Sequence, residues 1–175
     1  MIAFRDLTAE DIDVRVQSAR ESGVILLLYK NARVDMNILD ETVGPENWQR
    51  DHYECKGNLF CRVGINSSYA QPDKEARWLY KSDCGSQSNT EPEKGEASDS
   101  FKRACVNWGI GRELYTSPFI FIPAKYANIK ENKCSDKFAV EKIAIKDKKI
   151  VGLAIINTSL KREKQSEKRC FVWQA

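Results

Sequence analysis

Between Trp48 and Lys81 apolar and polar residues alternate, and this alternation restricts the fold more than any other feature of the chain. Alternation is typical of strands with one buried face, because successive side chains of a strand point to opposite sides of the sheet. The pattern predicts three strands, at residues 48–55, 59–66 and 77–81. A tight turn at residues 56–58 and a longer loop at residues 66–73 separate them, so we expect an antiparallel meander.

A long helix is predicted after the meander, at residues 91–108. Thr90 and Glu93 have the spacing of a capping box, which marks the N-terminus of a helix. At about 100° per residue, one stripe of this helix is apolar. The stripe consists of Ala97, Phe101, Ala104, Cys105 and Trp108. We expect it to pack on the meander and to form a β-β-β-α unit.

The N-terminal segment predicts two further helices with a strand between them. The first is expected from a Thr8 cap to about Gly23, because three apolar residues recur at nearly helical spacing. These residues are Ile12, Val16 and Ala19. A short buried strand is predicted at residues 24–30, and a second helix at residues 34–43 ends at Gly44-Pro45.

The C-terminal segment predicts a second sheet element. An apolar run at residues 119–122 is followed by a β-hairpin of residues 139–145 and 150–156, and by a last short strand at residues 170–173. The predicted fold class is therefore α+β: a meander packed on a long helix, with additional N-terminal helices and a C-terminal β-hairpin. No linker is long enough to divide the chain, so we expect one domain over residues 1–175.

Composition excludes some classes of protein. Apolar residues make up 42% of the 175 residues and aromatic residues 10%, which is enough for a core. No apolar run reaches the roughly 18 to 20 residues of a membrane span, and no export signal is visible. The six cysteines form no C-x-x-C pair, so we expect reduced thiols in the cytoplasm and no zinc site. The net charge of +3 is too small to indicate a nucleic-acid partner by itself.

The most informative segment is residues 98–115, which read SDSFKRACVNWGIGRELY. On a helical wheel Lys102 flanks the apolar stripe and Arg103 points about 100° further away. Adjacent cations on a rigid helix could hold successive phosphates of a nucleic acid. A solvated helix face with ion pairs, such as Asp99 with Arg103, is the alternative interpretation.

The meander carries further cations and aromatic residues. Arg62, Arg77 and Lys81 are at strand positions and could line one solvent-facing side beside the helix, or could be edge charges that prevent aggregation. Aromatic rings can stack on unpaired bases, at about 1 to 3 kcal/mol each. The candidates for stacking are Tyr53, Tyr69 and Tyr80, whereas Trp48, Trp78 and Trp108 are expected in the core.

Residues 98–115 resemble the signature of the Rad52 superfamily, in which a helix carries a D-x-x-K-R-A core and ends in an aromatic-Gly pair. The phage single-strand annealing members, of the Sak-like type, are the most similar, through the pattern S-D-x-F-K-R-A followed by W-G-I-G-R-x-L-Y. The pattern R-V-x-x-x-x-L-x-E-x-x-G…W, which starts at Arg33, is similar to the family's element before the sheet. The resemblance covers residues 33–115, and residues 116–175 are expected to be a β-rich extension of the same domain.

The resemblance implies binding of single-stranded DNA along a basic groove of an oligomeric ring, and annealing of complementary strands in recombination and repair. Lys102 and Arg103 match the paired cations of the motif, and Arg33 matches the arginine of the preceding helix. Val106 stands where some members have a third basic residue, whose contact Arg112 could replace. Lys94 is a further candidate, although the similarity around it is weak.

Annealing needs no covalent chemistry, and the chain has no G-x-x-x-x-G-K-[ST] loop for ATP, so we expect no enzyme activity and no cofactor or metal. Three alternatives stay open. One is a magnesium-dependent nuclease that would use Asp35, Asp51, Asp83 or Asp99. Another is a module that binds double-stranded RNA or DNA. The third is a ring-forming mediator that recruits a host single-strand binding protein or recombinase; a phage or host exonuclease is also a possible partner. The basic loop at residues 161–169 could bind DNA or such a partner.

Overall fold

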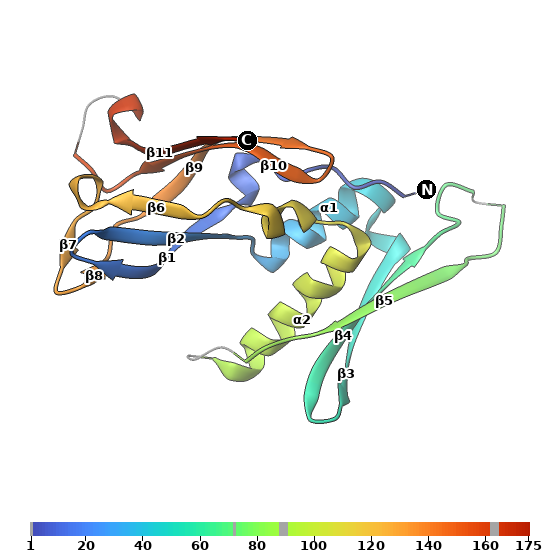
Figure 1. Cartoon of the computed structure of the whole chain (residues 1–175). Helices are drawn as coiled ribbons and strands as arrows, with labels where there is room; N and C mark the ends of the chain where they lie inside the picture. Colours follow the sequence, from blue (N-terminus) through green and yellow to red (C-terminus); the bar gives the residue numbers. More distant parts are fainter. Residues whose placement is uncertain (1, 72, 88–90, 162–164) are drawn as a thin grey trace. The chain divides into compact units, whose positions relative to one another are not determined.

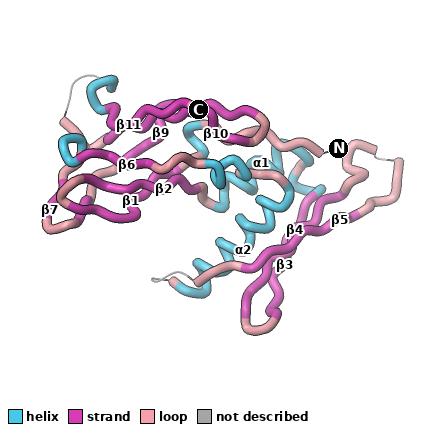
Figure 2. The backbone as a smooth tube through the Cα atoms, viewed as in Figure 1, coloured by secondary structure: helices cyan, strands magenta, loops and turns pink. Residues whose placement is uncertain are grey.

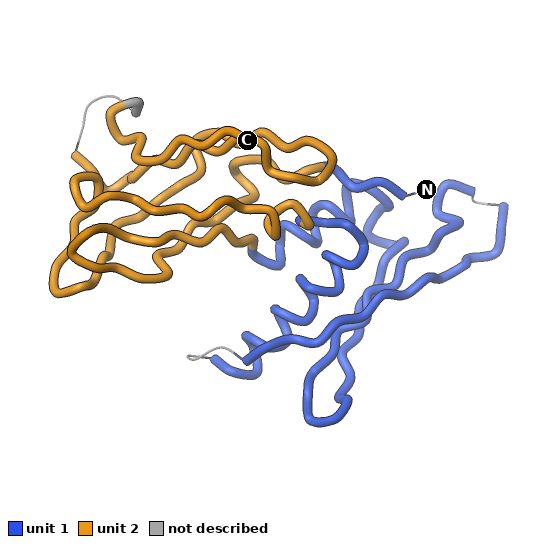
Figure 3. Tube along the Cα trace, in the orientation of Figure 1, with its two compact units in different colours: residues 1–5, 31–111 blue, residues 6–30, 112–175 orange. Residues whose placement is uncertain are grey.

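The computed structural model describes the chain except for residues 1, 72, 88–90 and 162–164 (Figure 1). It divides into two compact units, one of residues 1–5 and 31–111 and one of residues 6–30 and 112–175 (Figure 3). The α+β fold class is confirmed, with mostly antiparallel strands and a C-terminal hairpin. The single domain over residues 1–175 stays a prediction. Among the described residues, no helix is both long and apolar enough to cross a membrane.

The first unit contains a three-stranded sheet and two α-helices. Its elements are α1 (Ala32–Val43), the 3-10 helix η2 (Pro45–Asn47), β3 (Trp48–Cys55), β4 (Asn58–Asn66), β5 (Trp78–Cys84) and α2 (Pro92–Trp108). The strand order β3-β4-β5, antiparallel throughout, confirms the predicted meander. At the turn between β3 and β4, Lys56 and Gly57 have φ values of 52° and 75°. Positive φ at both central residues is what a tight two-residue hairpin requires.

The core of this unit lies between α2 and one face of the meander. Six side chains there are fully buried: Cys61, Val63 and Ile65 of β4, and Phe101, Ala104 and Cys105 of α2. At the end of α2, Trp108 Nε1 donates a hydrogen bond to the Val63 carbonyl at 3.1 Å. The predicted packing of the apolar stripe on the meander is therefore confirmed. The capping box expected at Thr90 lies outside the described residues, and α2 begins at Pro92.

The second unit is built on a six-stranded sheet of order β11-β10-β9-β1-β2-β6 (Figure 2). Its strands are β1 (Asp13–Arg20), β2 (Gly23–Tyr29), β6 (Ile120–Pro123), β9 (Phe138–Lys146), β10 (Lys149–Asn157) and β11 (Arg169–Gln174), with a small ribbon of β7 (Ile129–Lys130) and β8 (Lys133–Cys134). Its 3-10 helices are η1 (Ala9–Asp11), η3 (Arg112–Thr116), η4 (Ala124–Tyr126) and η5 (Gln165–Lys168). The edge strands β6 and β11 approach each other, so the sheet curves around its own apolar core.

The helix expected from Thr8 to about Gly23 is wrong, because this segment forms β1 and pairs with β2. Thr8 and Asp11 do make a capping contact, Thr8 N to Asp11 Oδ2 at 2.8 Å, but it caps only the short η1. The register shifts between Val16 and Ser18. This bulge adds one residue to the strand and interrupts the alternation of apolar and polar residues. The apolar residues therefore recur at a spacing that resembles that of a helix. The other predicted elements, including α1 and the C-terminal hairpin, are confirmed.

Candidate nucleic-acid interface

Lys102 and Arg103 occupy adjacent positions on α2, in the half of the helix that packs on β4 and β5. Phe101 and Ala104, which flank the pair in the sequence, are fully buried, so their side of α2 faces the core. The side chains of Lys102 and Arg103 are 27% and 41% exposed. Both side chains are therefore partly accessible, as expected for long basic side chains, although the Nε atom of Arg103 is itself buried.

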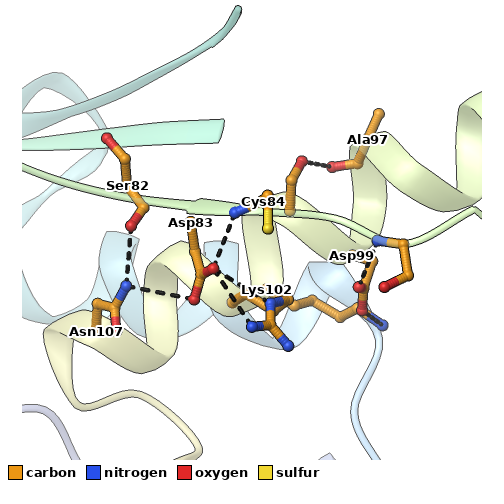
Figure 4. Close-up of polar contacts among 10 residues, drawn as sticks. Ser82, Asp83, Cys84, Ala97, Asp99, Lys102 and Asn107 are labelled. Carbon is orange, nitrogen blue, oxygen red and sulfur yellow. Dashed lines mark hydrogen bonds and ion pairs between the residues drawn. The ribbon is translucent and has the colours of Figure 1, made fainter. Parts of the chain in front are cut away.

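Arg103 faces a carboxylate of the neighbouring strand. Its Nε and Nη2 atoms each lie 3.4 Å from Oδ1 of Asp83, which is labelled in Figure 4. Asp83 is itself held by the chain, because Oδ1 accepts a hydrogen bond from the Cys84 N–H at 2.9 Å. Asn107, one turn further along α2, bonds to the Ser82 carbonyl at 3.0 Å and approaches Asp83 Oδ2 at 3.5 Å. Arg103 is thus oriented by the end of β5.

Lys102 faces a carboxylate of its own helix, with Nζ 3.9 Å from Asp99 Oδ1. The second oxygen of Asp99 accepts the Ser86 N–H at 3.0 Å, which ties the segment after β5 to α2 (Figure 4). Gly85 permits this contact. A Cβ atom at Gly85 would lie 2.1 Å from the Glu96 carbonyl oxygen, so only glycine fits so close to the helix backbone.

The remaining motif cations lie on other elements. Arg33 is exposed in the first turn of α1, where its N–H is capped by Asn31 Oδ1 at 2.9 Å. Lys94 is exposed near the start of α2 and pairs with Glu91 at 3.2 Å. Arg112, the expected replacement for a cation at Val106, is exposed at the start of η3 in the second unit. The structure places Arg33 and Lys94 in the same unit as Lys102 and Arg103.

The three meander cations do not share one side of the sheet. Arg62 is opposite Ser82 and lies on the face turned away from α2, whereas Lys81 is opposite Val63 and lies on the face of α2. Lys81 Nζ donates to the Asn107 carbonyl at 2.7 Å and sits 4.8 Å from the Trp108 ring centre. Arg77 precedes β5 and is exposed. The alternative in which these cations line one face is wrong. Residues paired across a ladder share a face, and Arg62 is paired with Ser82, the residue after Lys81.

The face turned away from α2, here called the open face, carries aromatic rings and an ion pair. Tyr53 stacks on Phe60 with ring centres 5.5 Å apart, and Arg62 lies 5.0 Å from the Tyr80 ring. Arg62 also bonds Asp51 at 2.6 Å, and this hydrogen bond lowers the pKa of the Asp51 carboxyl below its usual range. Of the stacking candidates, Tyr53 and Tyr80 are 41% and 45% exposed.

The other aromatic expectations are met in part. Tyr69 is half-buried, and Trp48, Trp78 and Trp108 are also half-buried rather than fully enclosed. One contact was missed. Arg50 lies over the Phe101 ring at 4.4 Å on the face of α2, where Trp48 also stacks at 6.1 Å. Every second residue of β3 shares that face, so the strand register alone would have found Arg50 once β3 was assigned.

The four acids of the nuclease alternative have different partners and surroundings. Asp51 pairs with Arg62, Asp83 with Arg103 and Asp99 with Lys102, while Asp35 is fully buried in α1. Within the described residues, no group of three or more His, Cys, Asp or Glu side chains is arranged to hold a metal ion. Of the basic loop at residues 161–169, residues 162–164 lie outside the described part of the chain.

Residues 4–133 match the sequence model of a family described as Rad52/22 family double-strand break repair protein. The matched range includes the whole meander, α2 and both cations of the pair. It also includes β1 and β2, which lie outside residues 33–115, the range in which the family motifs were found. Comparison with curated proteins and with solved structures finds no match.

Proposed function

The chain belongs to the Rad52/22 family of double-strand break repair proteins, and from this membership we propose that it binds single-stranded DNA and anneals complementary strands. The observation that carries the proposal is the adjacent pair Lys102 and Arg103 on α2, a helix that packs on the meander. Both residues lie inside the matched range. Two cations on a rigid support suit consecutive phosphates, because their spacing is set before DNA arrives.

A protein that holds a strand by its phosphates leaves the base edges available for pairing. A second strand can then test registers until base pairs accumulate, each step contributing about 1.4 kcal/mol. The energy comes from pairing, so the proposed activity needs no ATP and no covalent step, and the protein is proposed not to be an enzyme. Arg33 on α1 and Arg112 on η3 are proposed as further phosphate contacts.

The remaining parts of the proposal concern assembly and context. We propose an oligomeric ring of the phage single-strand annealing type that works in the cytoplasm of a bacterial host. A ring would continue the row of phosphate contacts from one subunit to the next, which supports binding of long strands. A single-strand binding protein or an exonuclease is the proposed partner class.

The deciding experiment is annealing of two complementary labelled oligonucleotides without ATP or metal. It compares the wild type with Lys102→Ala/Arg103→Ala and with a control that removes the same charge, Lys146→Ala/Lys149→Ala. The control residues are exposed near the β9–β10 turn of the second unit. We expect loss of annealing only in the α2 variant. Loss of two phosphate contacts should also lower the slope of log affinity against log salt by about 1.4.

Each result has a definite meaning. If the wild type neither binds nor anneals single strands, the proposed function is wrong. If both double variants lose activity equally, general positive charge is responsible and the site on α2 is wrong. If duplex RNA or DNA competes better than single strands, the duplex-binding alternative replaces the proposal. Circular dichroism and sedimentation of all three proteins establish that fold and oligomeric size are unchanged.

A further inference from the structure

Both cations of the proposed DNA site already face carboxylates of the same unit. Arg103 lies 3.4 Å from Asp83, and Lys102 lies 3.9 Å from Asp99. The site therefore contains two positive and two negative groups, and its local formal charge is balanced. A phosphate of DNA carries the same kind of oxygen as a carboxylate, so phosphates and these two acids compete for the same two cationic side chains.

The two ion pairs are looser than others in the molecule. Charge-assisted N–H to O contacts are typically about 2.7–2.9 Å long. Arg62 reaches Asp51 at 2.6 Å, and Arg169 reaches Glu141 at 2.5 and 2.8 Å. The contacts of Lys102 and Arg103 are longer by more than half an ångström. The contact between each cation and its acid is consequently weaker than a close charge-assisted hydrogen bond.

The acids, in contrast, are fixed by hydrogen bonds from the backbone. Asp83 Oδ1 accepts from the Cys84 N–H at 2.9 Å, and Asp99 Oδ2 accepts from the Ser86 N–H at 3.0 Å. These donors remain when a cation turns away, so the acids stay in place. The cations are thus the exchangeable partners, and Figure 4 shows Asp83 on the end of β5 and Asp99 on α2.

We propose that Asp83 and Asp99 are positioning residues that hold Arg103 and Lys102 in the absence of DNA and compete with phosphate for them when DNA binds. The inference rests on the proposed function of this site. Competition lowers the affinity for each phosphate, which lets a bound strand shift register while it searches for its complement. The two acids therefore set how tightly a strand is held.

Neutral isosteres test the competition. Asp83→Asn and Asp99→Asn keep the shape of the side chain and an oxygen that can accept the backbone N–H. We expect each variant to bind single-stranded oligothymidylate about 3- to 10-fold more tightly, and the double variant to anneal more slowly at saturating protein. A cation that no longer faces a carboxylate contacts DNA phosphate more fully, so more counterions are released on binding. The slope of log affinity against log salt should therefore steepen by up to about 0.7 per variant.

A matched control and a double-mutant cycle separate this effect from general charge. Asp73→Asn removes one negative charge from an exposed turn of the same unit and should change affinity little. Asp83→Asn should have no effect in an Arg103→Ala background, because the competing partner is absent. Asp83→Glu should return the wild-type affinity. Thermal unfolding of each variant identifies any that is destabilised. If Asp83→Asn is destabilised, Asp83→Glu supplies the test through its slope of log affinity against log salt.

The outcomes distinguish the inference from the function it rests on. If wild-type protein binds single strands but Asp83→Asn binds equally or more weakly, the acids do not compete with phosphate and the inference is wrong, while the function stands. If tightening persists without Arg103, it arises from general charge, and the inference is again wrong. If the wild type does not bind single strands at all, the proposed function and the inference fail together.

Discussion

The ring of Tyr80 lies flat over Gly64 on the open face of the meander. The two residues are directly opposite each other on β5 and β4, and a Cβ atom at position 64 would lie 2.4 Å from Cε1 of Tyr80. The Tyr80 hydroxyl accepts a hydrogen bond from Gln49 Nε2 at 2.8 Å, so the ring spans from β5 across β4 to β3. Gly64 is the residue that allows this crossing.

Gly64→Ala should therefore destabilise the first unit by about 1–3 kcal/mol, as expected for an added methyl group in a filled site. A Gly-to-Ala change within a strand would otherwise be favourable, because alanine loses less backbone entropy. The measurement is the urea midpoint of unfolding. In a Tyr80→Ala background the penalty should vanish. A penalty of equal size in both backgrounds would show that Tyr80 is not the obstacle.

Gly85→Ala should destabilise more strongly than Gly64→Ala. The new Cβ would meet backbone, the Glu96 carbonyl at 2.1 Å and the Ser100 nitrogen at 2.8 Å, and backbone cannot turn aside as a ring can. The segment after β5 must then leave α2, which breaks the bond from Ser86 to Asp99. Hydrogen exchange should report the release of the Ser86 amide. Unchanged protection of that amide would contradict the prediction.

The errors in the predicted fold have a common cause, which is that local spacing does not specify long-range pairing. Ile12, Val16 and Ala19 fit a helix, but Ile12, Val14 and Val16 fit a strand equally well, and the bulge after Val16 hides the alternation. Pairing with β2 decides between the two. α1 and the meander were predictable because the spacing of apolar residues stays regular over several turns or strands. Residues that end an element, such as Gly44 after α1, also mark their boundaries.

The candidate site was predictable at α2 and not at the sheet. The neighbouring positions of Lys102 and Arg103 follow from the helix period alone. The partner of Arg103 does not, because Asp83 lies beyond the strand predicted at residues 77–81 but belongs to β5, opposite Cys61. The register of β5 depends on the segment that joins it to β4, whose length leaves several pairings possible. This is also why the sequence left open a common face for Arg62 and Lys81.

Cysteine chemistry should separate into accessible and protected thiols. Cys55 is exposed, whereas Cys61, Cys105 and Cys170 are buried. Burial raises the pKa of Cys61 to about 11 and that of Cys170 to about 12. A thiol reagent at pH 8 should modify Cys55 first and the buried three only after unfolding, as mass spectrometry of the digested protein would show. Early modification of Cys61 would contradict its burial beneath α2.

The raised pKa of Cys61 also predicts a loss of stability at alkaline pH. The unfolded chain ionises this thiol from about pH 9, while the folded protein keeps it protonated up to about pH 11. Stability therefore falls as pH rises through that window, by at most about 1.4 kcal/mol per pH unit. Comparing the wild type with Cys61→Ala isolates this contribution, because all other groups titrate in both. Parallel pH profiles would exclude it.

Arg169 of β11 reaches across β10 to Glu141 of β9, with two bonds of 2.5 and 2.8 Å. The hydrogen bond from Arg169 lowers the pKa of the Glu141 carboxyl. A lowered pKa in the folded state means that the pair stabilises the protein above the ordinary value of 4.5, and that this stability is lost as pH falls through the folded value. Glu141→Gln should consequently unfold at lower urea than the wild type at pH 7. The difference should shrink toward pH 3, because protonated glutamate resembles glutamine. A difference that persists at pH 3 would assign the effect to packing rather than to the charge.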